Sequence, residues 1–206
     1  DESIILHRGT RVRKCHTSRR DAFKSINAGP LARVAGNEII MLTDEYRLRN
    51  PDRELILKPR FDERSTLIKY YPGLKLDVID WYVSEGYRGI VLEGTGLGHV
   101  RRECFPAIER AIKSGVIVAM TSQCIWGRVN MNVYSTGRDL LMMGVVPLGD
   151  MLAETALVKM MWCLAQTDDP EEVKRLLLTN IAGEISQRTV EHIEPLKTLM
   201  GRAVGS

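Results

Sequence analysis

The sequence has no apolar run long enough to span a lipid bilayer. One of the longest, residues 116–120, holds five residues, whereas a membrane helix needs about 20. The chain also opens without the basic segment and long apolar core of a signal peptide. We therefore expect a cytoplasmic protein that makes no contact with a membrane.

Cysteines are few, and their spacing does not fit a zinc site. The four stand at positions 15, 104, 124 and 163, without a Cys-x-x-Cys or Cys-x-x-His motif. This spacing excludes the usual zinc sites, and we expect no bound metal and only free thiols. Cys104 and Cys163 fall within helical patterns and are predicted to lie in the core.

A strong excess of charge of either sign is also missing, since the net charge is +3. The exception is residues 8–24, where seven basic residues accompany a single aspartate. Such a cluster can steer a protein toward phosphate groups, although most basic segments are simply solvated. The sequence leaves both interpretations open, contact with nucleic acid and a solvated face.

The distribution of apolar residues divides the chain into three parts. Residues 1–43 are predicted to form short strands and turns. Residues 44–64 are rich in charge and contain two prolines, which is typical of a linker between domains. From residue 65 to residue 206, apolar strands alternate with helices over short connections, which predicts a parallel sheet. The predicted fold class is therefore α/β, with a small three-layer domain of the flavodoxin-like or Rossmann-like kind.

Individual elements follow from apolar periodicity and from glycine and proline signals. In residues 65–206 we predict strands at 67–71, 89–92 and 116–120, and helices at 78–83, 100–114, 137–143, 151–165 and 170–178. Asp150 and Glu154 are one helical turn apart, which is also the spacing of an acid/base pair. Asp150 is better interpreted as the N-cap of the helix that follows, with Glu154 in the first turn.

The segment Gly94-Thr95-Gly96-Leu97-Gly98 follows a strand and is predicted to open a helix, at the edge where parallel sheets bind ligands. Its glycine order is a poor match to a dinucleotide fingerprint, so a tight turn and another substrate-facing loop remain as alternatives. Glu93 and His99 flank the segment and are candidate substrate-binding residues. A carboxylate can orient an amine and a histidine can donate to a carbonyl, while helix capping and a surface position are the simpler explanations.

Lys14 is the strongest single candidate for a catalytic residue. If a hydroxyl of Thr17 or Ser18, or a carboxylate, lies beside it and it is partly desolvated, its ammonium is easier to deprotonate. It can then relay protons to a hydroxyl nucleophile. Spacing alone favours an exposed lysine on a basic strand, because surface lysines are the rule.

Several longer motifs resemble the bacterial-type L-asparaginase family. They are Val-Arg-Lys-Cys-His-Thr-Ser at 12–18, the segment at 21–31, Gly-Ile-Val-Leu-Glu-Gly-Thr-Gly at 89–96, and residues 121–131. The resemblance is closer to one branch, the D subunits of archaeal glutamyl-tRNA(Gln) amidotransferases, through residues 92–99, 132–138, 150–156 and 178–185. It covers nearly the whole chain. It implies that residues 1–43 end the family's first domain, that 44–64 are the linker, and that 65–206 form its second domain.

This resemblance implies a glutaminase-like reaction. A threonine attacks the side-chain amide of glutamine or asparagine, ammonia leaves an acyl-enzyme, and water releases the acid. Lys14 falls on the position of the lysine that assists. In the amidotransferase branch, ammonia passes to an E subunit, which binds tRNA(Gln) and uses ATP and magnesium to convert Glu-tRNA(Gln) to Gln-tRNA(Gln). The resemblance implies no cofactor for this chain. It does imply homodimerisation, because the family completes its sites across a dimer interface.

Two of the family's motifs are missing from the sequence. Neither the Thr-Gly-Gly-Thr-Ile stretch of the nucleophile nor the Gly-Thr-Asp-Thr stretch occurs. We therefore expect the carboxy-terminal portion of a longer enzyme, inactive by itself. The alternatives are a cytoplasmic L-asparaginase and a non-catalytic nucleotide-binding or assembly module. His99 falls near a substrate-contacting asparagine of a neighbouring subunit in related asparaginases, and Cys124 near a regulatory site of cytoplasmic asparaginases.

Overall fold

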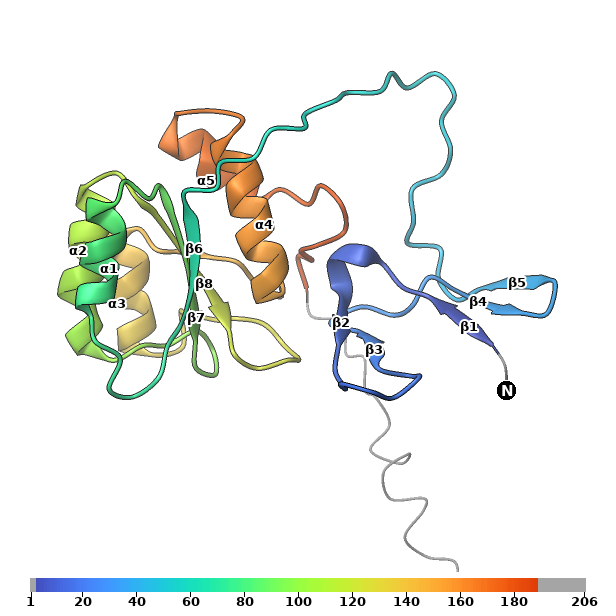
Figure 1. The fold of residues 1–206 in the computed structure, drawn as a ribbon, viewed down its shortest axis with the longest axis horizontal. Coiled ribbons are helices and arrows are strands. Elements are labelled where there is room, and N and C mark those ends of the chain that lie inside the picture. The colour runs from blue at the N-terminus through green and yellow to red at the C-terminus, as the bar shows by residue number, and fades with distance from the viewer. Residues whose placement is uncertain (1–2, 189–206) are drawn as a thin grey trace, which may run out of the picture.

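The computed structural model of the protein describes residues 3–188. Two regions are joined by an extended segment that arches away from both (Figure 1). The strands are β1 (Ile4–Leu6), β2 (Val12–Lys14), β3 (Phe23–Ser25), β4 (Ala32–Ala35), β5 (Glu38–Met41), β6 (Ser65–Lys69), β7 (Gly89–Gly94), β8 (Ile117–Ser122) and β9 (Val146–Pro147). The helices are α1 (Asp77–Ser84), α2 (Phe105–Lys113), α3 (Ser135–Met143), α4 (Ala153–Leu164) and α5 (Pro170–Leu178), with 3₁₀ turns at Gly9–Arg11 and Arg102–Cys104.

The second region is built on a parallel sheet with the strand order β6-β7-β8-β9. The order follows the chain, so each connection advances one strand in the same direction. Since crossovers between parallel strands share one hand, α1, α2 and α3 lie on one face, and α4 and α5 cover the other (Figure 1). The predicted three-layer α/β fold is confirmed. The strand order does not reverse within residues 3–188, so these strands form no switch point of the kind that binds dinucleotides.

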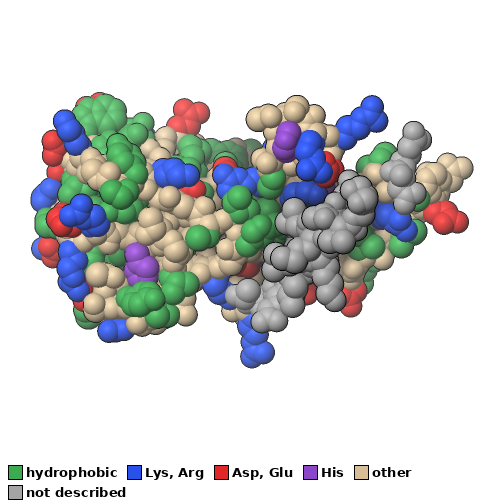
Figure 2. Space-filling view, turned by 90° about the horizontal axis from the view of Figure 1, so that it is seen from below, with side chains coloured by type: hydrophobic (Ala, Val, Ile, Leu, Met, Phe, Trp, Pro, Cys, Tyr) green, Lys and Arg blue, Asp and Glu red, His purple; other side chains and the backbone are tan. Residues whose placement is uncertain are grey.

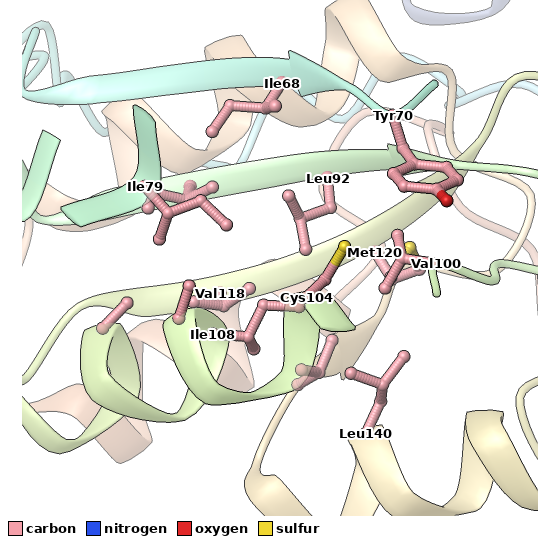
Figure 3. Close-up of a cluster of buried hydrophobic side chains, with 14 of the residues drawn as sticks. Ile68, Tyr70, Ile79, Leu92, Val100, Cys104, Ile108, Val118, Met120 and Leu140 are labelled. Carbon is pink, nitrogen blue, oxygen red and sulfur yellow. The ribbon is translucent and has the colours of Figure 1, made fainter. Parts of the chain in front are cut away.

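Apolar side chains fill both sides of this sheet. Ile90 and Leu92 of β7 pack toward α1, α2 and α3, whereas Val91 between them packs toward α4. Figure 3 shows the first of these clusters, in which Ile108 of α2 faces Val118 of β8. A strand covered on both faces is apolar at successive positions, which explains the uninterrupted run at 116–120.

The first region consists of two small antiparallel sheets. One has the order β1-β4-β5 and the other is the hairpin of β2 and β3, in which Lys14 lies opposite Phe23. No helix or strand occurs between Met41 and Ser65, and the end of this segment runs along α4. There the Trp162 indole donates to the Lys58 carbonyl at 3.0 Å, and the Asp62 amide donates to the Met161 carbonyl at 2.8 Å.

Most predicted elements are present, and some local predictions are wrong. Helix α5 has the predicted bounds, and Asp169 caps it by accepting from the Glu171 amide at 3.0 Å. The helix predicted at 100–114 begins only at Phe105, after a 3₁₀ turn. Asp150 is not an N-cap, because Leu152 holds that position in α4 and the Asp150 carboxylate is buried elsewhere. The predicted domain at 65–206 includes residues 189–206, which lie outside the described residues.

The thiols should fall into two reactivity classes. Cys15 and Cys124 are exposed, and Cys104 and Cys163 are buried, as predicted for the latter pair. Burial raises the pKa of the Cys163 thiol to about 12 and also raises the pKa of Cys104. Because the thiolate is the reactive form, we expect a thiol reagent at about pH 8 to modify two cysteines of the native chain and all four after unfolding. Rapid modification of a third thiol in the native chain would contradict the buried positions.

Candidate functional site

Polar side chains lie at the carboxyl edge of the parallel sheet, around Glu93. Glu93 is buried near the end of β7, and its carboxylate lies 3.7 Å from the ammonium of Lys69, its neighbour on β6. Its neighbour on β8 is Thr121, whose hydroxyl donates to the Leu92 carbonyl at 3.4 Å. Side chains alternate along a strand, so Glu93 faces the α4 side of the sheet, as Val91 does.

The glycine-rich segment after Glu93 folds back on itself. The Thr95 amide donates to the His99 carbonyl at 2.9 Å, and the amides of Gly98 and His99 both donate to the Thr95 carbonyl. Gly96 and Gly98 have positive φ values of 51° and 95°, which glycine adopts without strain. The prediction that this segment opens a helix is therefore wrong, since the amides of Thr95, Gly98 and His99 are hydrogen-bonded inside the turn. The tight-turn alternative describes it.

His99 lies beside α3, on the opposite side of the sheet from Glu93. Its Nδ1 atom is 3.4 Å from the Thr136 hydroxyl, and its ring packs edge-on against Tyr134 with 5.2 Å between centroids. Its Nε2 atom is buried and has no hydrogen-bond partner within residues 3–188. An unpaired buried nitrogen is costly, so a further partner is expected there. Within the described part of the chain, no hydrogen bond or ion pair joins His99 to Glu93 or Lys14.

Lys14 ends strand β2 and is exposed. It lines a groove of about 780 Å³ together with Val158 and Trp162 of α4. Its neighbour Arg13 pairs with Glu154 at 3.1 Å, but no carboxylate within residues 3–188 pairs with Lys14 itself. Thr17 and Ser18 lie in the exposed turn after the strand, and neither makes a hydrogen bond to the Lys14 side chain. The described residues therefore do not provide the partial desolvation of the Lys14 ammonium that a catalytic role would require.

A buried polar joint anchors the strand that carries Lys14. The Arg11 side chain, directly before β2, is 2% exposed and pairs with the equally buried Asp150 at 3.1 Å. It also donates to the carbonyls of Gly183 at 2.8 Å and Asp150 at 2.9 Å. Asp150 in turn accepts from the amide of Ser186 at 2.9 Å and from its hydroxyl. Arg11 therefore ties the hairpin both to the end of the sheet and to residues 183–186.

Asn27 forms a second tie between the regions. It has a positive φ of 55°, which asparagine tolerates better than most residues. Its side-chain amide donates to the carbonyls of Gly127 at 2.9 Å and Asp150 at 3.0 Å, and its oxygen accepts from the Gly127 amide at 2.8 Å. The loop after β8 is thereby held against the hairpin. Sequence reasoning did not identify Arg11 or Asn27, because their partners are more than 90 positions away.

Lys159 of α4 and Glu184 form a second buried ion pair, with 2.5 Å between the Lys159 Nζ and Glu184 Oε1 atoms. Burial alone would raise the pKa of Glu184. The hydrogen bonds from Lys159 and from the amides of Ile181 and Ala182 outweigh that effect, so the pKa lies below its ordinary value. A carboxylate with a lowered pKa contributes stability above its unfolded-state pKa of about 4.3, and this is lost as the pH falls through the folded pKa.

We therefore expect the replacement Glu184→Gln to flatten the acid limb of the stability curve. Denaturant unfolding of both proteins between pH 7 and pH 3 measures the effect. The difference in unfolding free energy should be largest near neutral pH and should shrink in acid, because only the wild type loses this ionic contribution. Parallel curves for the two proteins across this range would contradict the assignment.

Two further observations concern the described part of the chain. No group of three His, Cys, Asp or Glu side chains within residues 3–188 is placed to hold a metal ion. No helix in the same range has the length and apolar character needed to cross a membrane.

Comparison with known proteins extends these observations. A family profile described as Glutaminase/Asparaginase C-terminal domain matches residues 66–177, and one described as Asparaginase, N-terminal matches residues 2–47. The chain is 58% identical to the D subunit of glutamyl-tRNA(Gln) amidotransferase from Methanothermobacter thermautotrophicus over 189 residues, covering 92% of this chain and 43% of that protein. It is 56% identical to the corresponding protein of Metallosphaera sedula over 190 residues, covering 91% and 43%. The chain thus spans less than half the length of these relatives.

Solved structures show the same fold. The thermostable L-asparaginase from Thermococcus kodakarensis matches with a TM-score of 0.81 at 35% identity, covering 89% of this chain and 56% of that one. L-asparaginase I from Vibrio cholerae matches with a TM-score of 0.79 at 33% identity, covering 88% and 55%. The resemblance to the D subunits of amidotransferases that the motifs predicted is confirmed. Because the first profile matches more than half of the sequence, the chain belongs to the glutaminase/asparaginase family.

Proposed function

We propose that this chain is part of an amidotransferase subunit that hydrolyses glutamine or asparagine and supplies ammonia for converting Glu-tRNA(Gln) to Gln-tRNA(Gln). The observation that carries the proposal is the identity of 58% and 56% to two amidotransferase subunits. The identity to two L-asparaginases is only 35% and 33%. This contrast favours the amidotransferase over the second candidate, a cytoplasmic L-asparaginase.

In the proposed reaction, a threonine outside this chain attacks the side-chain amide carbonyl and forms an acyl-enzyme. Lys14 takes the proton of the attacking hydroxyl and passes it to the departing nitrogen, so that ammonia leaves. Water then releases the acid by the reverse proton path. The joint of Arg11 and Asp150 supports this role, because it fixes the backbone three residues before Lys14. The end of the hairpin is exposed, which leaves the Lys14 ammonium free to meet residues outside 3–188.

The substrate contacts are proposed for two residues that this chain holds apart. Glu93 carries a buried carboxylate on the α4 side of the sheet and would orient the α-amino group of the substrate. His99 has an unpaired Nε2 atom within residues 3–188 and would contact a substrate amide or carboxylate in a neighbouring subunit. Two separate positions are compatible with sites shared across a homodimer.

The assembly follows from the same proposal. Residues 1–43 would end the first domain, 44–64 would link it to the second, and 65–206 would contain the second. A partner E subunit would bind tRNA(Gln), ATP and magnesium in the cytoplasm, and this chain would need no cofactor of its own. A nucleotide-binding module is disfavoured, because two amides of the glycine segment, those of Thr95 and Gly98, are already bonded within the turn.

Ammonia release from glutamine and from asparagine tests the proposal. We expect none from residues 1–206 alone, and release once the remaining part of a family member with its nucleophilic threonine is supplied. Addition of an E subunit, Glu-tRNA(Gln) and ATP should then yield Gln-tRNA(Gln). Hydrolysis without transfer would favour the asparaginase alternative. Ammonia release by the chain alone would overturn the idea of a divided site.

A further inference from the structure

The place of the Lys14 ammonium depends on how its hairpin is anchored. Strands β2 and β3 have three residues each and pair only with each other among the described residues. A two-stranded hairpin by itself is marginally stable. Residues 14–21 at its end are all exposed, and Figure 2 shows basic side chains at the surface of the first region. The exposed ion pair of Arg13 and Glu154 adds little near this end, so the base of the hairpin must fix its direction.

Two side chains anchor the base of the hairpin. Arg11 precedes β2 and Asn27 follows β3, and the Ile26 amide donates to the Arg11 carbonyl at 2.7 Å. Both side chains donate to one acceptor, the carbonyl of Asp150, at 2.9 and 3.0 Å. Asn27 also bonds to Gly127 in the loop after β8. Because a body held at one place can turn about it, the bonds of Asn27 to this loop supply the second point of attachment.

An asparagine suits this place in two ways. The φ of 55° at Asn27 lies in the left-handed region, which asparagine visits more easily than most residues. Both N–H groups of its side chain donate, one to the Gly127 carbonyl and one to the Asp150 carbonyl, while its oxygen accepts from the Gly127 amide. Asn27 thus binds both backbone groups of Gly127, as one peptide unit pairs with another. An aspartate would have no N–H to donate and would face two carbonyl oxygens.

We propose that Asn27 is a positioning residue for Lys14, which holds the hairpin against the loop after β8 and so presents the Lys14 ammonium at a fixed place. The inference rests on the proposed function, in which Lys14 moves the proton of the nucleophile. It assigns part of the efficiency of that step to a residue that makes no hydrogen bond to Lys14. Such remote control is physically reasonable, because misplacement of a reacting group by about 1 Å can cost about 10²-fold in rate.

The two exposed thiols of the chain report this geometry without any catalysis. Cys15 follows Lys14 directly, Cys124 lies in the loop that Asn27 holds, and the other two cysteines are buried. Nitroxide labels on Cys15 and Cys124 therefore give the distance between the hairpin and the loop by double electron–electron resonance. The wild-type chain should show one narrow distribution. Asn27→Gly should broaden it, because glycine adopts the positive φ without strain but lacks all three side-chain hydrogen bonds.

The kinetic test uses residues 1–206 joined to the remaining part of the D subunit from Methanothermobacter thermautotrophicus, with its nucleophilic threonine. We expect Asn27→Gly to lower kcat for amide hydrolysis by about 10–100-fold and to leave KM within about twofold of the wild type, since the proton carrier is misplaced and substrate binding is not. In a Lys14→Ala background, the same replacement should change kcat by less than about twofold, because no lysine remains to be positioned.

Asn37→Gly is the matched control. Asn37 lies exposed in the turn between β4 and β5 of the same region, and its side chain makes no hydrogen bond within residues 3–188. The same replacement there should leave the label distances unchanged and kcat within about twofold of the wild type. Asn27→Asp, which keeps the acceptor and loses both donors, should behave like Asn27→Gly.

An unchanged label distribution in Asn27→Gly would overturn the positioning role. An equal fall of kcat with and without Lys14 would overturn it as well, because a merely structural residue lowers activity in both backgrounds. Absence of ammonia release from the wild-type fusion would contradict the proposed function, and a broadened distribution in Asn27→Gly would then still support the anchoring of the hairpin by Asn27.

Discussion

Replacement of Asp150 by alanine should lower the free energy of unfolding by about 3–5 kcal/mol, because it leaves the buried Arg11 guanidinium without its carboxylate. Both side chains are 2% exposed, so water does not readily replace the lost partner. The change also removes the acceptor of the Ser186 amide and hydroxyl. Denaturant unfolding followed by tryptophan fluorescence measures the loss, and hydrogen exchange at Ser186 should accelerate.

The matched control is Glu154→Ala, which breaks a second ion pair between the same two regions. Arg13 and Glu154 are 34% and 56% exposed, and exposed pairs contribute about 0–1 kcal/mol. A double replacement, Arg11→Met with Asp150→Leu, should recover part of the stability, since no charge is then left unpaired. Equal losses of unfolding free energy in Asp150→Ala and Glu154→Ala would show that the buried pair of Arg11 and Asp150 stabilises the fold no more than the exposed pair does.

Replacement of Lys14 by alanine should reduce amide hydrolysis by about 10²–10⁴-fold in a protein that also contains the family's nucleophilic threonine. The expectation rests on the proposed function, in which this side chain moves the proton of the nucleophile. The loss should appear mainly in kcat, because the exposed side chain of Lys14 makes no hydrogen bond or ion pair within residues 3–188. Thermal unfolding should change little.

Lys24→Ala provides the control for this prediction. Lys24 lies on β3, opposite Arg13, and its ammonium is 3.5 Å from the Asp21 carboxylate at the surface. Its replacement removes the same charge from the same hairpin and should leave kcat unchanged. A similar loss in both variants would indicate an effect of charge on the hairpin instead of proton transfer by Lys14.

Elements governed by neighbouring residues were predictable from the sequence. The start of α5 follows from Pro170 and the capping Asp169, and the end of α2 follows from Gly115, whose φ is 87°. Strands β7 and β8, which are covered on both faces, follow from continuous apolar runs. These signals are local, so one sequence suffices to read them.

Features governed by distant contacts were not predictable in the same way. An aspartate before an apolar helix has the local pattern of an N-cap, and only Arg11, 139 positions earlier, reveals that Asp150 is an ion-pair partner. The glycine segment likewise resembles the opening of a helix until the hydrogen bonds between Thr95 and His99 close it into a turn. For Lys14, the position came from family motifs, and its surroundings depend on residues outside 3–188.

The joint at Arg11 also constrains the order in which the chain can fold. Its partners include Gly183, and Thr10 beside it donates to Ala182, in both cases 172 positions along the chain. Local strand–helix–strand units of the parallel sheet can form as they are made, whereas contacts of such separation must wait. At ordinary rates of synthesis, roughly 10–30 s separate residue 11 from residue 183 on the ribosome. During that time the hairpin of β2 and β3 lacks its contacts with residues 182 and 183, so a much later segment of the chain completes its anchoring.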